Sequence, residues 1–253
     1  MTVLDMRRPL RFAVLAAATV AMGVTAGCAG GGNKKKDVAY VARDVDTLYT
    51  AAKDRLDRGD AKQAAALFDE VERQHPYSPW ARRAQLMSAF SYYAARDYSK
   101  SVQSAQRFLS IHPGNKDAPY AYYLVALCYY EQISDVTRDQ KITQQALTAM
   151  NELVRRYPNT DYAADARLKI DLINDHLAGK EMEIGRMYQR SGKWLAGTLR
   201  FRAVAEKYQT TSHAPEALYR LAAAVLGTNY PGSKWYERSY ELMNKYAPGT
   251  KAA

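Results

Sequence analysis

The chain has 253 residues, of which 36 are Lys or Arg and 26 are Asp or Glu, so its formal net charge at pH 7 is +10. This length is enough for one elongated domain or two compact ones. The basic balance suits anionic lipid headgroups, an acidic protein partner or nucleic acid, but the export signal at the N-terminus argues against nucleic acid.

Residues 1–27 are predicted to be a lipoprotein signal peptide. Arg7, Arg8 and Arg11 precede an uncharged apolar run, and small residues then lead to Cys28. The run is too short to cross a membrane, which takes about 20 apolar residues. A cysteine directly after small residues resembles a lipobox, although Thr25 stands where that pattern favours Leu. We therefore expect lipid attachment at Cys28 and anchoring to a membrane; ordinary cleavage with an incidental Cys28 is the alternative.

Residues 28–42 are predicted to form a flexible lipidated tether. The segment that begins with Ala29 is rich in Gly and Lys and has too few apolar groups to pack. Ala29 rather than Asp follows Cys28, which resembles the Gram-negative pattern for sorting to the outer membrane. With Cys28 acylated, Cys128 has no disulfide partner, and its apolar neighbours predict a buried and inert thiol.

A short phrase returns five times in the rest of the chain: an aromatic or His residue, usually followed by proline, and then small turn residues. The phrases begin at His75, His112, Tyr157, Tyr208 and Tyr230. Proline cannot continue a helix and biases the preceding residue away from helical dihedrals, so each phrase predicts the end of one helix and the approach to the next. Because strand patterns are nearly absent from the sequence, we predict an all-α fold, a superhelical array of tetratricopeptide-type helical hairpins.

Counting back from each phrase places small and bulky residues where the tetratricopeptide repeat needs them. The small residues let two helices approach, and the bulky side chain fills the space beside them. The pairs are Ala64 and Phe68, Ala89 and Tyr92, Ala105 and Phe108, Ala126 and Tyr129, Ala146 and Met150, Gly185 and Tyr188, and Gly197 and Phe201.

The predicted array spans residues 43–253. Its repeats cover about 43–76, 79–113, 118–158 and 178–209, followed by a shortened terminal repeat at 214–246. Gly59, Arg96 and Gly192 are expected in the turns between the two helices of their repeats. In the third repeat, about eight residues around 134–141 are expected to lengthen that turn.

Two places break the repeat pattern. Residues 162–176 are expected to form an extended helix that ends at Gly179. Between residues 209 and 231 there is room for only one helix, so residues 222–228 are interpreted as a splice of two shortened helices. The segment 235–246 is expected to cap the array.

No pattern in the sequence indicates catalysis. The four histidines have no paired metal-ligand spacing, and two of them belong to the repeated turn phrase. The sequence has no Gly-rich phosphate loop and no G-x-S-x-G or H-E-x-x-H motif. We therefore expect no catalytic residue, no metal site and no cofactor, and a protein that works by binding other proteins.

Tyrosines gather on the predicted first helices of consecutive repeats. The repeat itself needs an aromatic residue at Tyr92 and Tyr129, whereas the neighbouring positions point about 100° away and are free to meet a ligand. An aromatic groove suits an extended peptide, because tyrosine offers a large contact area at small entropy cost. The predicted substrate groove consists of Tyr92, Tyr93, Tyr122, Tyr123 and Tyr130. Ordinary core packing is the alternative.

Several of these features together resemble one family, the BamD (ComL-type) outer-membrane lipoproteins of the β-barrel assembly machinery. The resemblance covers essentially all of the mature chain. It is carried by the lipobox with its tether, residues 75–78, residues 122–130, the phrase Asp-Val-Thr-Arg-Asp-Gln at 135–140, and residues 192–196 leading into Arg200 and Phe201.

The resemblance implies a non-enzymatic scaffold, lipid-anchored on the periplasmic face of the outer membrane. It implies binding of the barrel-inserting protein BamA through a POTRA domain, receipt of the signal strand of unfolded outer-membrane proteins, and contact with other assembly lipoproteins. The N-terminal repeats would take the substrate and the C-terminal repeats would face BamA. Arg200 matches the family's arginine on that side, and with Arg202 it is the expected partner-binding pair; a solvated helix-face role is the alternative for Arg200.

Two other kinds of protein remain as alternatives. A periplasmic tetratricopeptide adaptor of a cell-envelope or cell-division complex would usually carry a coiled coil and no lipobox. A glycan-capturing lipoprotein should expose tryptophan platforms outside the repeat register. Trp80 and Trp235 each fall four residues after a repeat proline, which favours packing for both.

Overall fold

The computed structural model describes residues 44–230 and 232–246 of the chain. The predicted signal peptide, the tether with Cys28 and residues 247–253 lie outside the described residues. Within the described part the secondary structure is entirely helical, without a strand. The helices are α2 (Val45–Asp57), α3 (Ala61–Gln74), α4 (Pro79–Ala94), α5 (Tyr98–Ile111), α6 (Ala118–Tyr130), α7 (Lys141–Arg156), α8 (Asp161–Arg190), α9 (Trp194–Lys207), α10 (Ala214–Asn229) and α11 (Lys234–Tyr246).

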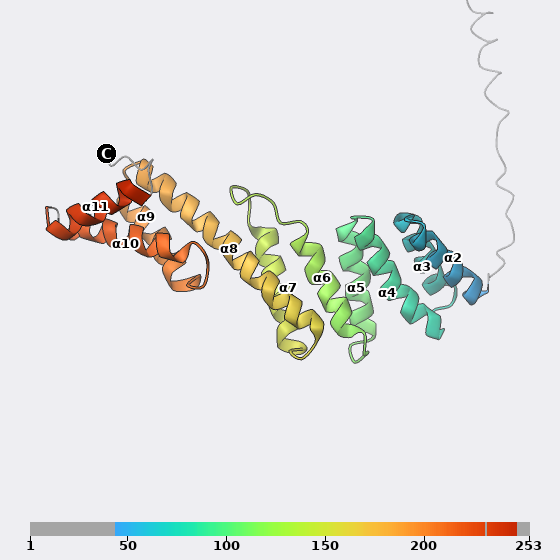
Figure 1. Ribbon diagram of the computed structural model, residues 1–253. Coiled ribbons are helices and arrows are strands. Elements are labelled where there is room, and N and C mark those ends of the chain that lie inside the picture. Colours follow the sequence, from blue (N-terminus) through green and yellow to red (C-terminus); the bar gives the residue numbers. More distant parts are fainter. Residues whose placement is uncertain (1–43, 231, 247–253) are drawn as a thin grey trace, which may run out of the picture. The chain divides into compact units, whose positions relative to one another are not determined.

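Each helix packs against its neighbours in chain order (Figure 1). In addition, α2 contacts α4, α4 contacts α6, and α6 contacts α8. The first helices of consecutive hairpins therefore lie side by side, as stacked helical hairpins require. The all-α array of hairpins predicted from the repeat phrase is confirmed.

The turns inside three hairpins share one backbone conformation. Gly59, Arg96 and Gly192 have φ values of 85°, 59° and 69°. In each turn the amide of the following residue donates to a carbonyl in the last helical turn at 2.9 Å. This pattern is the helix ending that favours glycine, because a side chain is strained at positive φ. Arg96 is the non-glycine residue of the three.

The five turn phrases also share one conformation. Their first residues have φ between −137° and −127° and ψ between 44° and 58°. The amide of each still donates to the helix, and its carbonyl accepts from the amide three residues later at 3.0 to 3.3 Å. Ser78 and Thr160 then cap the following helices through their side chains. The prediction that each phrase ends a helix is confirmed at His75, His112, Tyr157, Tyr208 and Tyr230.

The core consists of the small and bulky residues that the repeat pattern selects. Phe68, Phe108 and Phe201 are at most 1% exposed. The small residues paired with them in the second helices, Ala64, Ala105 and Gly197, are also buried. Cys128 is buried too; its Sγ donates to Ser101 Oγ at 3.2 Å, and burial raises its pKa to about 11. The expected burial of this thiol is confirmed.

The expectation that a helix ends at Gly179 is wrong, because α8 runs without interruption through Gly179 and Gly185. Neither glycine has the positive φ that ends a helix. Both instead allow close packing: a Cβ on Gly179 would lie 3.1 Å from His213 Nε2, and one on Gly185 would lie 2.6 Å from Phe201 Cε1. This close approach explains why glycine, which costs about 1 kcal/mol inside a helix, occurs there. The helix also crosses residue 178, where the fourth repeat was expected to begin.

The C-terminal hairpin differs from expectation in two ways. The interpretation of residues 222–228 as a splice of two helices is wrong, since α10 is one continuous helix that pairs with α11. Gly227 makes room for this pairing, because a Cβ there would lie 2.7 Å from Tyr236 Cε2. The expected packing of Trp235 is also wrong, since this residue is 70% exposed.

The expected insertion in the third hairpin is confirmed as the loop 131–140 between α6 and α7. Its organising residue is Gln140, whose side-chain amide donates to the carbonyls of Asp135, Val136 and Arg138 at 3.0 to 3.4 Å. Lys180 of α8 donates to Thr137 O at 2.7 Å. This hydrogen bond ties the loop to α8, the first helix of the fourth hairpin.

Candidate functional site

An open cavity of about 830 Å³ lies between α2, α4 and the loop 114–117. The Tyr49 and Trp80 rings pack with centroids 4.7 Å apart, and the Arg83 guanidinium lies 5.6 Å from the Trp80 ring centroid. Arg82 and Lys116 add positive charge to the lining, which also contains one carboxylate, that of Asp117. The lining thus combines two aromatic rings with an excess of cationic over acidic side chains, which suits a peptide that carries aromatic and acidic groups. Sequence reasoning missed this site, although Trp80 followed closely by Arg82 and Arg83 was a signal.

The five tyrosines of the predicted groove do not come together in one groove. Tyr92 on α4 is held by its neighbouring helices: its hydroxyl donates to Asp69 Oδ2 of α3 at 2.7 Å, and Lys100 of α5 lies 5.4 Å from its ring centroid. Burial, and then the hydrogen bond to Asp69, raise the Tyr92 pKa well above its ordinary value. These contacts favour packing for Tyr92, which was the alternative interpretation.

Tyr93 and Tyr123 belong to an aromatic cluster that reaches from α4 to α8. Tyr93 and Tyr120 pack against the same core residues, and the Tyr162 ring of α8 lies 5.6 Å from Tyr120 and 5.2 Å from Tyr123. The Tyr123 hydroxyl donates to Asp165 Oδ2 at 2.5 Å. Burial raises the Tyr120 pKa to about 12, so these hydroxyls stay neutral donors at physiological pH.

Tyr130 is linked to this cluster through α8, whereas Tyr122 shares only the underlying core with Tyr123 and Tyr130 and directs its ring elsewhere. Lys169 pairs with Asp165 at 2.8 Å and lies 5.6 Å from the Tyr130 ring centroid. Tyr122 instead meets α7, where the Arg156 guanidinium lies 5.3 Å from its ring centroid. It lines a separate cavity of about 560 Å³ between α5, α6 and α7. The ring contacts therefore group Tyr93, Tyr123 and Tyr130, while those of Tyr92 and Tyr122 are with other helices.

The two arginines of the expected partner-binding pair point to different sides of α9. Two positions along a helix are about 200° apart. Arg200 Nη1 lies 3.0 Å from Glu181 Oε2 of α8, with the two side chains 42% and 25% exposed. Arg202 lines a cleft between α9 and α10. The structure therefore does not place the two arginines on one face of α9.

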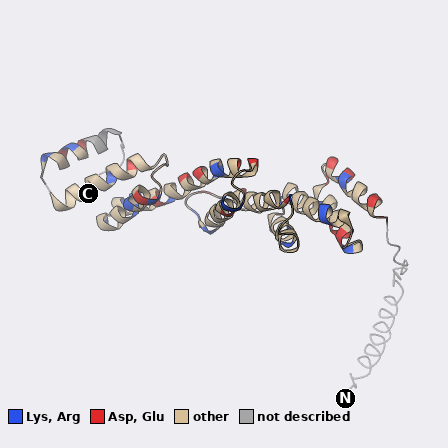
Figure 2. Cartoon of the chain, turned by 90° about the horizontal axis from the view of Figure 1, so that it is seen from below, with Lys and Arg blue, Asp and Glu red and all other residues tan. Residues whose placement is uncertain are grey.

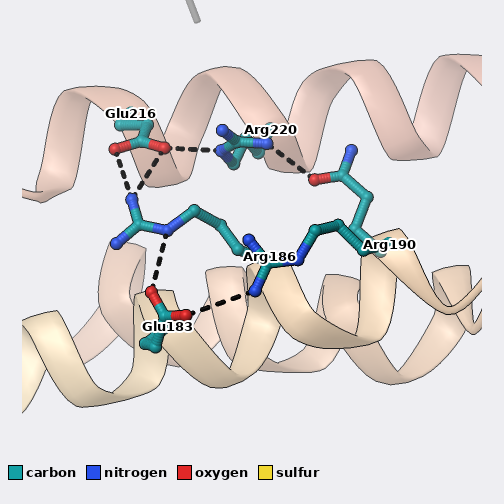
Figure 3. Close-up of polar contacts among 6 residues, drawn as sticks. Glu183, Arg186, Arg190, Glu216 and Arg220 are labelled. Carbon is teal, nitrogen blue, oxygen red and sulfur yellow. Dashed lines mark hydrogen bonds and ion pairs between the residues drawn. The ribbon is translucent and has the colours of Figure 1, made fainter. Parts of the chain in front are cut away.

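A network of ion pairs fixes α10 against α8 (Figure 3). Glu216 accepts from Arg186 at 3.0 and 3.1 Å and from Arg220 at 2.6 Å. Arg220 is only 3% exposed and also donates to Gln189 Oε1 at 2.7 Å. Glu183 extends the network to Arg186 and Arg190. These contacts hold the helices on both sides of α9 in place, and so position the faces that carry Arg200 and Arg202.

Lys and Arg are interspersed with Asp and Glu along the described helices (Figure 2). Many of them pair locally, as Glu152 does with Arg155 and Arg156. Among the described residues there is no group of three or more His, Cys, Asp and Glu side chains placed to hold a metal ion. No helix in that part of the chain combines the length and the apolarity needed to cross a membrane.

Comparison with known proteins identifies the family. Residues 41–238 match the model of the YfiO family, described as outer membrane lipoprotein. The chain is 51% identical to the outer membrane protein assembly factor BamD of Caulobacter vibrioides, over 92% of this chain and 81% of that protein. It is 42% identical to BamD of Rickettsia prowazekii, over 86% and 92% of the two chains, and 31% identical to BamD of Neisseria gonorrhoeae, over 88% and 94%.

Among solved structures, the chain is similar to a tetratricopeptide repeat protein from Parabacteroides merdae, with 17% identity, a TM-score of 0.37, and coverage of 81% and 67%. That likeness is too weak to add to the assignment, which depends on the family model and the curated relatives. The chain belongs to the BamD family of outer-membrane assembly lipoproteins.

Proposed function

We propose that this protein is an outer-membrane protein assembly factor that acts as a non-enzymatic scaffold. It binds a BamA-like barrel protein through a POTRA domain, receives the signal strand of unfolded outer-membrane proteins, and works beside other assembly lipoproteins. The observation that carries the proposal is the 51% identity to a BamD assembly factor over 92% of the chain. The hairpin array supports it, because stacked hairpins expose extended surfaces for protein ligands.

The substrate end is the N-terminal part of the array. The cavity beside Tyr49, Trp80 and Arg83 offers ring faces and positive charge to a strand with aromatic side chains and a carboxylate. The cluster of Tyr93, Tyr123 and Tyr130 continues the aromatic surface along the first helices of the following hairpins. An extended strand passing along these helices would meet both.

The barrel-protein end is the α8–α9 face that carries Arg200. This guanidinium is partly exposed while paired to Glu181, so a carboxylate of the partner can approach it and exchange with Glu181. The ion-pair network of Arg186, Glu216 and Arg220 keeps this face in one arrangement. A preorganised face binds with a smaller loss of conformational entropy.

The anchor in this proposal is the acylated Cys28, followed by the tether 28–42. Several acyl chains together hold a protein stably at a membrane, and a short tether keeps the array at high effective concentration near the site of barrel insertion. The scaffold would thereby stay on the periplasmic face of the outer membrane.

Depletion of the chain from its own cells tests this function. The amount of folded barrel proteins in the outer membrane should fall, and re-expression of the full chain should restore it. A Cys28→Ser variant, which cannot be acylated, should be found in the soluble periplasmic fraction and restore the barrel proteins only partly. Normal levels of folded barrel proteins during depletion, together with a defect in cell division, would favour the adaptor alternative instead.

A further inference from the structure

A second surface that the proposed function does not use lies between α9 and α10. It is a cleft of about 840 Å³. Its lining residues are Gly192, Lys193, Trp194, Leu195, Ala196, Thr198, Arg202, Ala224, Val225, Thr228 and Asn229. Arg202 is about 200° around α9 from Arg200, so the cleft faces away from the surface assigned to the barrel protein.

Apolar side chains are unusually exposed along this cleft. Leu195 is 77% exposed and Val225 is 38% exposed, and they come from the two helices that form the walls. Leu199, one turn after Leu195 on α9, is 55% exposed. Single exposed leucines are ordinary on protein surfaces, but apolar groups that gather from two helices around one cleft mark an interaction site.

The charges of the cleft have one sign. Lys193 and Arg202 are exposed and line it, and no carboxylate is among its lining residues. Within the described part of the chain neither cation forms an ion pair. By contrast, Arg186 and Arg220 on the adjoining helices are both paired to Glu216. Two unpaired cations beside the exposed side chains of Leu195 and Val225 are complementary to a ligand that is apolar on one side and acidic at its edges.

We propose that this cleft binds an amphipathic helix of a second protein partner, with an apolar face against Leu195 and Val225 and carboxylates against Lys193 and Arg202. A groove between two helices accepts a third helix through apolar anchors spaced three and four residues apart. A protein segment fits better than a lipid surface, because the apolar groups of α9 and α10 line a concave cleft, whereas insertion into lipid needs a protruding apolar face. The proposal is independent of Arg200.

Site-specific photocrosslinking in living cells tests this proposal on the full anchored chain. Photoreactive p-benzoylphenylalanine replaces Leu195 or Thr228 in the cleft, and Leu168 of α8 serves as the control because it is 67% exposed and lies outside the cleft. Sequencing of the crosslinked peptides then shows the chemistry of the bound segment. The same experiment is repeated with Arg202→Glu and with Lys207→Glu, an equal change of charge on α9 outside the cleft.

The expected result is one protein adduct from positions 195 and 228 and none from position 168. The crosslinked segment should have helical apolar spacing with flanking Asp or Glu, and Arg202→Glu should lower the adduct about tenfold while Lys207→Glu leaves it unchanged. The proposal is overturned by lipid adducts alone, by the absence of a shared adduct, by a segment without carboxylates, or by insensitivity to Arg202→Glu. Loss of the barrel protein with Arg200→Glu while the adduct persists would show that the two surfaces are independent. The adduct tests the cleft and binding of the barrel protein tests the proposed function, so the failure of one is distinguished from the failure of the other.

Discussion

Arg200 Nη1 and Glu181 Oε2 lie 3.0 Å apart, so the arginine expected to meet the barrel protein already has a carboxylate partner inside the chain. The pair joins α9 to α8, and both side chains keep part of their surface in solvent. An exposed pair of this kind contributes little to stability, about 0 to 1 kcal/mol. At the proposed interface, Glu181 and a carboxylate of the partner would compete for this one guanidinium.

Glu181→Gln should therefore strengthen binding of the barrel protein. The variant leaves Arg200 unpaired and removes the exchange step, so we expect affinity to rise by several-fold, about 1 kcal/mol, with unfolding midpoints nearly unchanged. Surface plasmon resonance with the partner's periplasmic domains measures the affinity. Asp171→Asn, which removes an exposed carboxylate from the same helix and leaves Arg200 paired, is the matched control. Weaker binding by Glu181→Gln would mean that Glu181 orients Arg200 rather than competing for it.

Gly185→Ala should destabilise the C-terminal hairpins. Alanine normally stabilises a helix relative to glycine, but a Cβ at this position would lie 2.6 Å from the Phe201 ring, and Phe201 is 1% exposed. We expect a loss of about 1 to 3 kcal/mol in urea unfolding followed by circular dichroism. In a Phe201→Leu background, Gly185→Ala should lower the free energy of unfolding by less than it does beside Phe201. Equal costs in the two backgrounds would show that the ring is not the obstacle.

Arg96→Gly should stabilise the second hairpin. Arg96 has φ of 59°, the left-handed region in which a side chain costs about 1 kcal/mol, and its two counterparts in other hairpins are glycines. We expect a gain of about 0.5 to 1 kcal/mol by the same unfolding measurement. Gly59→Ala, the reverse change at an equivalent turn, should lower stability by a similar amount. No gain from Arg96→Gly would indicate that the arginine side chain makes a compensating contribution.

Glu216→Gln should destabilise the chain at neutral pH and much less in acid. Burial alone would raise the Glu216 pKa. The hydrogen bond from Arg220 and the charges of Arg186 and Arg220 lower it by a larger amount, so the pKa in the folded chain lies below its ordinary value. A carboxyl whose folded pKa is lowered stabilises the fold above its unfolded pKa, and this contribution is lost as pH falls through the folded value. We expect a cost of about 1 to 3 kcal/mol at pH 7, because Arg220 is left buried with a weaker partner.

The matched control for this prediction is Glu152→Gln. Glu152 also pairs with two arginines, but these are 69% and 47% exposed, so Glu152→Gln should cost much less stability at pH 7 than Glu216→Gln. Unfolding of both variants and the parent is followed from pH 7 down to about 3. If the penalty of Glu216→Gln stayed constant over that range, the ionised carboxylate would not be its cause.

Much of the fold could be predicted from local signals in the sequence. Proline and the aromatic or His residue before it act on the backbone of their own turn, so His75, Tyr157 and the other phrases revealed helix ends without tertiary information. The pairing of Ala64 with Phe68 revealed the core in the same way. The prediction that a helix ends at Gly179 was wrong because this glycine instead lets α8 pack closely against His213, a residue distant in the chain.

The candidate site could be predicted only in part, for a related reason. Sequence spacing shows that Tyr92 and Tyr93 point in different directions, but which helix each of them meets depends on the assembled array. The pairing of Arg200 with Glu181 joins residues on two helices, and local spacing carries no sign of it. The cavity at Trp80 was likewise assembled from α2, α4 and a loop that follows α5.

Co-purification of the full anchored chain from detergent-solubilised envelopes tests the central claim most directly. The account predicts that a barrel protein with periplasmic domains co-purifies with the parent chain, is lost with Arg200→Glu, and is retained with Arg202→Glu, an identical change on the other side of α9. The identity of the retained protein is read by mass spectrometry. Absence of any barrel protein from the parent eluate would contradict the account, and equal retention by both arginine variants would contradict the assignment of Arg200.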